Sequence, residues 1–115
     1  MNKNGIKAMA LQNINAATIT PNVYTFFCTI PFPLVILRII NQSTAQMFFS
    51  YDGGVTTNEL VSTAVNNNEI TLNFQSNHLP NNNVAVLAAG TNVYVTCAVG
   101  ATGFVYLTGY YLPQG

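Results

Sequence analysis

The chain has 115 residues, of which only 5% are Asp, Glu, Lys or Arg and 50% are hydrophobic, whereas about 25% of an average soluble domain is charged. The three acidic and three basic side chains give a formal net charge of zero. Enough apolar residues are present for a hydrophobic core, so the composition predicts a single folded domain and excludes intrinsic disorder. A neutral surface with few charges opposes self-association weakly, and we therefore expect neighbouring proteins to cover part of it.

The basic residues are too few and too scattered for a nucleic-acid-binding surface. Lys3, Lys7 and Arg38 are the whole set, and affinity for nucleic acid depends on clustered Lys and Arg. The apolar run Phe32–Leu37 is far too short to span a bilayer, and polar residues over Gln12–Asn15 interrupt any signal-like apolar segment. We expect a protein that binds neither nucleic acid nor membranes and is made in the cytoplasm without a signal peptide.

The N-terminal segment lacks the pattern of the rest of the chain. Residues 1–22 are rich in Asn and Ala without sustained alternation, which predicts an extended N-terminal arm followed by a domain over residues 23–115. Val23–Ile30 is typical of a strand. Pro31 and Pro33 end it, because proline cannot donate to a central hydrogen-bond ladder.

The middle of the chain shows two-residue periodicity. Leu34–Ile40 is apolar on both faces except at Arg38, so we expect a central strand covered on both sides, or an edge strand covered by another subunit. Met47–Tyr51 is a further strand, followed by a tight turn at Asp52–Gly54. In Glu69–Gln75 apolar and polar residues alternate strictly, which indicates a half-buried strand of an antiparallel sheet.

The C-terminal third predicts two more strands after a long connection. Ser76–Thr91 contains Asn81–Asn83 and is long enough to suggest a functional or packed loop. Val93–Val99 alternates, Gly100–Gly103 is a turn of the kind found in hairpins, and Phe104–Leu112 is rich in aromatic and β-branched residues. The whole pattern predicts an all-β fold, an antiparallel β-sandwich or jelly-roll-like single domain with an extended N-terminal arm.

The titratable residues do not form a catalytic or metal-binding pattern. His78 is the only histidine, and the carboxylates Asp52, Glu59 and Glu69 show no paired spacing. The chain has no Gly-x-Ser-x-Gly nucleophile motif. We therefore expect no catalytic residue, no metal, no cofactor and no enzymatic activity.

The two cysteines, Cys28 and Cys97, both lie in strand-like runs. A disulfide between them would require their Cα atoms to lie within about 7 Å. In a chain without a signal peptide, two free buried thiols are the favoured interpretation.

Arg38 is the most informative single charge. In strand register it shares a face with Leu34, Ile36 and Ile40, where burial without a partner would be costly. Two interpretations stay open. Arg38 either forms an ion pair within the chain, with Asp52, Glu59 or Glu69, or acts as a buried anchor that pairs across a subunit interface.

Late tyrosines indicate a contact surface. The tyrosines at positions 94, 106, 110 and 111 favour core packing or a protein interface, with a glycan-stacking platform as the alternative. Together with the charged and loop residues, they complete the set of candidate partner contacts: Arg38, His78, Asn81, Asn82, Asn83, Tyr94, Tyr106 and Tyr110.

Five stretches carry a family resemblance: Leu37–Thr44, Phe49–Gly53, Leu72–Asn77 with Pro80–Asn82, Gly90–Val95 and Gly103–Tyr111. From about Leu37 onward the chain resembles small accessory structural proteins of tailed-bacteriophage virions. The resemblance implies a non-enzymatic virion component, made in the host cytoplasm and present in many copies. Its implied partners are copies of itself and a major capsid or head–tail protein, which it would reach as a capsid decoration or cement protein or as a head–tail accessory protein. The alternative function from another class is a carbohydrate-binding module.

Overall fold

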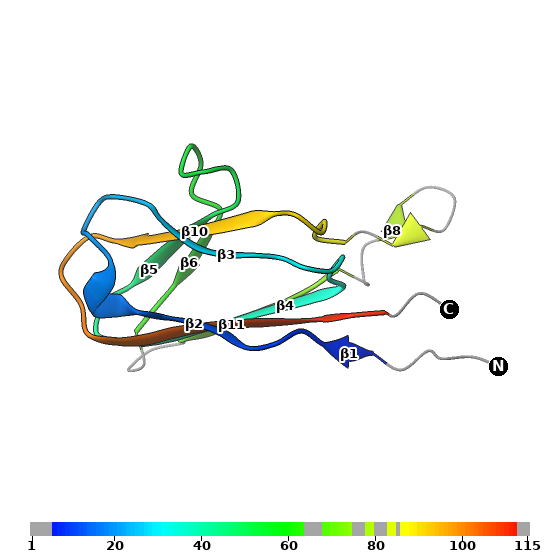
Figure 1. The fold of residues 1–115 in the computed structure, drawn as a ribbon, viewed down its shortest axis with the longest axis horizontal. Helices are drawn as coiled ribbons and strands as arrows, with labels where there is room; N and C mark the ends of the chain where they lie inside the picture. The colour runs from blue at the N-terminus through cyan, green and yellow to red at the C-terminus, as the bar shows by residue number, and fades with distance from the viewer. Residues whose placement is uncertain (1–5, 64–67, 75–77, 80–82, 85, 113–115) are drawn as a thin grey trace.

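Two antiparallel sheets stacked on one another make up the fold (Figure 1). The computed structural model describes residues 6–63, 68–74, 78–79, 83–84 and 86–112. Within these residues there is no α-helix, and Ala16–Thr18 form a 3-10 turn, η1. The prediction of an all-β antiparallel sandwich is confirmed.

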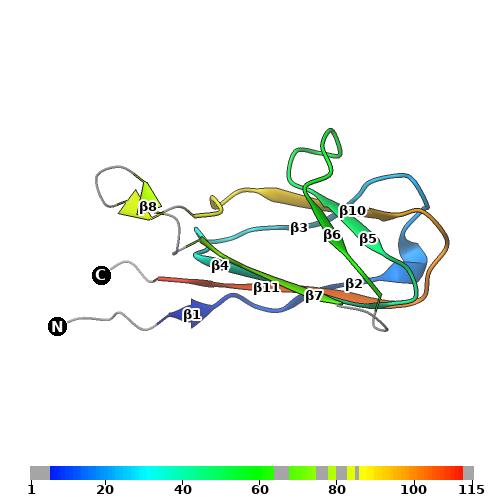
Figure 2. The ribbon, with the colours of Figure 1, turned by 180° about the vertical axis from the view of Figure 1, so that it is seen from behind.

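The first sheet has five strands and the second has four. In the first sheet β11 lies between the N-terminal strands and β4; its strands are β1 (Lys7–Ala8), β2 (Gln12–Asn15), β11 (Gly103–Tyr111), β4 (Ile36–Ser43) and β7 (Glu69–Asn73). The second sheet has, in spatial order, β3 (Thr25–Thr29), β10 (Asn92–Cys97), β5 (Met47–Ser50) and β6 (Glu59–Val61). A separate two-stranded ribbon, β8 (His78–Leu79) and β9 (Asn83–Val84), projects from one end, as Figure 2 shows from behind.

Strand pairing is nested around a central hairpin. β5 pairs with β6, β4 with β7, β3 with β10 and β2 with β11, and every pair is antiparallel. The chain therefore follows the course of one long hairpin whose two arms fold over into two sheets, with the β8–β9 ribbon in the connection from β7 to β10.

The described part of the N-terminal segment is extended and lies along its own domain. β1 and β2 both pair with β11, and the Met9 N–H donates to the Gly109 carbonyl at 2.9 Å between them. Met9, Ala16 and Ile19 belong to the buried core. The described part of the predicted arm thus contributes the two short strands β1 and β2 to the first sheet.

The core lies between the sheets, and alternation along β4 shows how it forms. Leu37 and Ile39 face inward and are fully buried, whereas Ile36, Arg38 and Ile40 face outward and are partly exposed. The strand is central, as predicted, but the expected cover on both sides is wrong for the described chain, because its outer side faces solvent.

The predicted late strands are present, with two differences. β10 ends at Cys97, and Val99 is 60% exposed. The Gly100–Gly103 segment does not close a hairpin, because β10 and β11 belong to different sheets. Gly103 itself has φ +97°, and a Cβ there would lie 2.5 Å from the Gln42 carbonyl oxygen, so the crossing to the first sheet requires glycine.

The register of β3 against β10 shifts between Val93 and Tyr94, as at a β-bulge. Phe27 packs against Phe49 in the core at 6.4 Å between ring centroids. Cys28, opposite Val93, is also buried, and both it and Cys97 are free thiols. Burial raises the pKa of the Cys28 thiol to about 11.

A buried amide stabilises the corner between the sheets. Asn41 is completely buried on the inner side of β4, and its Nδ2 donates to the carbonyls of Ala45, Val61 and Ser62 at 2.8, 3.0 and 3.0 Å. Its Oδ1 accepts from the N–H of Ser43 at 3.0 Å and from the Ser43 hydroxyl. One side chain thereby connects β4 to the segments that begin β5 and end β6.

Candidate functional site

The outer side of the first sheet carries three of the eight predicted contact residues, Arg38, Tyr106 and Tyr110. Because side chains alternate along a strand, β7, β4 and β11 point one set of side chains outward, which we call the tyrosine face: Ile36, Arg38, Ile40, Gln42, Glu69, Thr71, Asn73, Phe104, Tyr106, Thr108 and Tyr110. Phe104 is 41% exposed, and its ring stacks beside that of Tyr106 at 6.3 Å.

The register orders the tyrosine face into rows across the sheet. In the central row Arg38 lies between Thr71 of β7 and Thr108 of β11. On one side of it Ile36 is opposite Tyr110, and on the other side Ile40 is opposite Tyr106. A polar row that contains the arginine is therefore bordered by two rows that each pair an isoleucine with a tyrosine.

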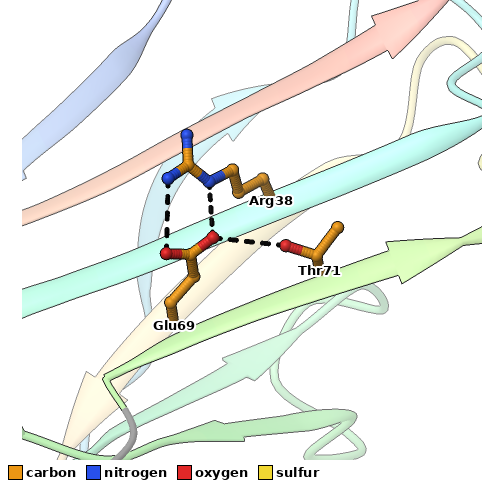
Figure 3. A network of polar contacts seen from close by, with 3 residues as sticks. All are labelled: Arg38, Glu69 and Thr71. Atoms are coloured by element: carbon orange, nitrogen blue, oxygen red, sulfur yellow. Dashed lines mark hydrogen bonds and ion pairs between the residues drawn. The ribbon is translucent and has the colours of Figure 1, made fainter.

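Arg38 forms an ion pair with Glu69 in the middle of the tyrosine face (Figure 3). Its Nε donates to Glu69 Oε2 at 2.6 Å and its Nη2 to Oε1 at 3.3 Å, while the Thr71 hydroxyl donates to Oε2 at 3.3 Å. Of the two interpretations left open by the sequence, the structure shows the pair within the chain. The chain itself leaves this pair partly open, since the side chains of Arg38 and Glu69 are 39% and 36% exposed on the outer side of the sheet. A role for Arg38 as an anchor at a subunit interface stays a prediction.

The pair stabilises both charges. The hydrogen bond and the charge of Glu69 raise the pKa of Arg38, with a smaller contribution from Tyr110. The hydrogen bond from Arg38 lowers the pKa of Glu69. A folded-state pKa below the ordinary value means that this carboxylate adds stability above its unfolded pKa and loses it as the pH falls.

The other two carboxylates are engaged in local structure. Asp52 accepts from the Ser50 hydroxyl at 2.6 Å and from the Thr56 N–H at 2.9 Å, and these hydrogen bonds lower its pKa to about 2. Glu59 accepts from the Tyr51 hydroxyl at 3.1 Å, and burial raises its pKa. The Asp52–Gly54 turn is thus structural, with Gly54 at φ +95°.

The four late tyrosines do not share one surface. Tyr106 and Tyr110 lie on the tyrosine face, whereas Tyr94 lies on the outer side of the second sheet. Tyr111 packs against the core and stacks on Phe32 at 4.0 Å. A glycan platform built from all four rings is therefore wrong.

The second sheet also exposes apolar side chains, which we call the Phe26 face: Phe26, Phe48, Leu60 and Tyr94. Phe26 is 52% exposed and Leu60 is 56% exposed. Phe26 and Tyr94 meet edge to face at 5.8 Å. The two outward sides of the sandwich thus both carry aromatic and aliphatic groups.

The loop candidates are only partly placed. The backbone of His78 pairs with Val84 and that of Leu79 pairs with Asn83 in the β8–β9 ribbon. Asn81 and Asn82 lie outside the described residues, as do the side chains of His78 and Asn83.

The described residues contain no group of three or more His, Cys, Asp or Glu side chains that gathers in one place, and no pocket opens among them. None of the helical structure described has the length and apolar character needed to cross a membrane. The arrangement offers flat side-chain surfaces for contact.

Sequence reasoning did not select several of the face residues as contacts, among them Ile36, Ile40, Phe26 and Leu60. Their signal was the alternation itself. Ile36 and Ile40 have the same parity as Arg38 and therefore share its solvent-facing side.

Compared with known proteins, the chain matches no family model, no curated protein and no solved structure.

Proposed function

We propose that this protein is a non-enzymatic structural subunit that works in many copies in a tailed-bacteriophage virion. It acts there as a capsid decoration or cement protein, or as a head–tail accessory protein. Its partners are copies of itself and a major capsid or head–tail protein, and binding uses side-chain surfaces of the sandwich. The assignment to a virion rests on the sequence resemblance described above.

The observation that supports a structural role most strongly is that both outward sides carry aromatic and aliphatic side chains and few charges. A single sheet face of an antiparallel sandwich is normally solvated and polar. Here the tyrosine face and the Phe26 face lie on opposite sides of one small domain, and only Arg38 and Glu69 among their residues are charged. Large exposed apolar surfaces mark interaction sites, and two opposite ones suit a subunit that lies between neighbours.

The strand order supports the same proposal. Nested pairing of β2 with β11, β3 with β10, β4 with β7 and β5 with β6 is what a jelly roll requires, since that fold is a double sheet of eight strands with two Greek keys. We infer a jelly roll, a fold used by viral capsid domains. Modest contacts at each face would add up through avidity when many copies bind one lattice.

Co-sedimentation tests the proposal. Purified protein is mixed with particles of the phage that encodes it and centrifuged through a cushion. Val55→Lys is the control, because Val55 is 85% exposed in the loop between β5 and β6 and belongs to neither face. We expect wild type and the control to pellet with particles, at a level that changes little with salt because few charges take part. Protein that stays in the supernatant at every ratio of protein to particle would contradict the proposal.

A carbohydrate-binding module is the second candidate. Tyr106 and Tyr110 do share an open sheet side, and Phe104 lies beside Tyr106, so a smaller aromatic platform exists. A glycan array followed by titration of tyrosine fluorescence separates the two functions. Saturable sugar binding by the isolated domain that Tyr106→Ala abolishes would favour the carbohydrate function.

A further inference from the structure

We propose that the tyrosine face binds the same face of a second copy, around a two-fold axis that brings the two Arg38–Glu69 pairs together. This inference deepens the proposed function, because it names the occupant of one of the two apolar sides. In such an isologous contact each residue meets its counterpart's neighbours reciprocally. Each Arg38 then has the copy's Glu69 within reach in addition to its own.

Charge complementarity selects a second copy as the occupant. Among its residues, the tyrosine face holds one cation and one anion, 2.6 Å apart at their nearest atoms and surrounded by Ile, Thr and Tyr. An apolar partner would strip water from this pair without replacing its hydrogen bonds, which is costly. A strongly acidic or basic partner would match one charge and repel the other. A copy related by a two-fold axis presents the opposite charge to each, so four charges alternate in sign.

The size and composition of the tyrosine face also suit a dimer. The side of the first sheet that carries it is four strands wide and as long as the nine residues of β11, which at ~4.8 Å per strand and ~3.4 Å per residue gives that whole side a flat footprint of roughly 600 Å². This area is of the same order as the ~800 Å² that each partner buries in a standard interface. Tyrosine and arginine are the residue types enriched where interfaces gain most of their affinity.

Charge-reversal variants and their mixture test the arrangement. Arg38→Glu gives a tyrosine face with two anions, and Glu69→Arg gives one with two cations, so each variant should repel its own copies and self-associate at least ~10-fold more weakly than wild type. In an equimolar mixture, the two anions of the Arg38→Glu variant face the two cations of the Glu69→Arg variant, so position 38 of each copy meets an opposite charge at position 69 of the other. We expect the mixture to recover association near the wild-type level.

Sedimentation velocity from about 1 µM to about 1 mM covers the range in which a weak dimer forms. Val55→Lys is the matched control, because Val55 is 85% exposed in the loop between β5 and β6 and belongs to neither face. This variant should self-associate like wild type, and circular dichroism melts show whether each variant folds. A wild type that stays monomeric throughout, a single reversal that still dimerises, or folded variants whose mixture stays monomeric would each overturn the inference. No phage particle is used, so failure here leaves the co-sedimentation result standing, and the reverse also holds.

Discussion

The buried amide of Asn41 offers the sharpest test of how the sandwich is held together. Asn41→Ala removes a fully buried side chain that donates to three carbonyls and accepts from Ser43. The Ala45 carbonyl keeps the Ser43 hydroxyl as a donor at 2.9 Å. The Ser43 N–H and the Val61 and Ser62 carbonyls lose their contacts with the amide.

A buried polar group left without a partner costs about 1–3 kcal/mol. With at least the Ser43 N–H and the Val61 carbonyl affected inside the core, we expect Asn41→Ala to lower the free energy of unfolding by about 2–4 kcal/mol. In a domain of this size ~1 kcal/mol corresponds to ~4 °C. The expected decrease in Tm is therefore roughly 8–16 °C.

Urea unfolding followed by far-UV circular dichroism measures the effect directly. The control is Gln42→Ala on the neighbouring exposed position of β4, which should change the free energy of unfolding by no more than about 0.5 kcal/mol. A loss below about 1 kcal/mol for Asn41→Ala with an unchanged m-value would refute the assignment of these hydrogen bonds to corner stability.

Three further predictions follow from single sites. Gly103→Ala should destabilise by more than ~1 kcal/mol in thermal melts, because its Cβ would lie 2.5 Å from the Gln42 carbonyl at φ +97°; an unchanged Tm would contradict the geometry. Iodoacetamide at about pH 8 should label Cys28 and Cys97 only after unfolding, because burial raises both pKa values; rapid labelling of native protein would count against it. Burial raises the pKa of Glu59, so the contribution of this side chain to stability falls as the pH rises. In paired melts, the Tm of Glu59→Gln should therefore increase relative to the Tm of wild type between about pH 4 and about pH 7. A Tm difference that is constant with pH would argue against burial as the cause.

The strands were predictable where alternation is local. Glu69–Gln75 and Phe104–Leu112 carry their strand signal in adjacent residues, and both form strands within one or two residues of the expected limits. β1 and β2 have little local signal, because their paired residues on β11 lie 89 to 104 residues further along the chain. Tertiary pairing, and not propensity, makes residues 7–8 and 12–15 strands. The Gly100–Gly103 turn was recognised, but local turn chemistry does not determine which sheet the next strand joins.

The candidate site was predictable in its residue types and less so in its arrangement. Arg38 was expected to pair either within the chain, with one of three carboxylates, or across a subunit interface, and the antiparallel register of β4 with β7 brings Glu69 to it within the chain. Tyr94 and Tyr106 look equivalent in sequence, yet the chain changes sheets between them and places them on opposite sides. Which apolar residues face solvent depends on how the sheets stack, because Ile36 and Ile40 fit a buried or an exposed side equally well.

Covered sheet faces are the central claim, and oxidative footprinting of the free and particle-bound protein tests them most directly. Hydroxyl radicals modify exposed tyrosines, which mass spectrometry then locates. Tyr106 and Tyr110 report on the tyrosine face and Tyr94 on the Phe26 face. We predict that the tyrosines of at least one face are oxidised several-fold more slowly on the particle than in the free protein. The loop around Val55, which is 85% exposed, should be oxidised at the same rate in both. If each of the three tyrosines were oxidised to the same extent in the free and in the particle-bound protein, the account would be contradicted.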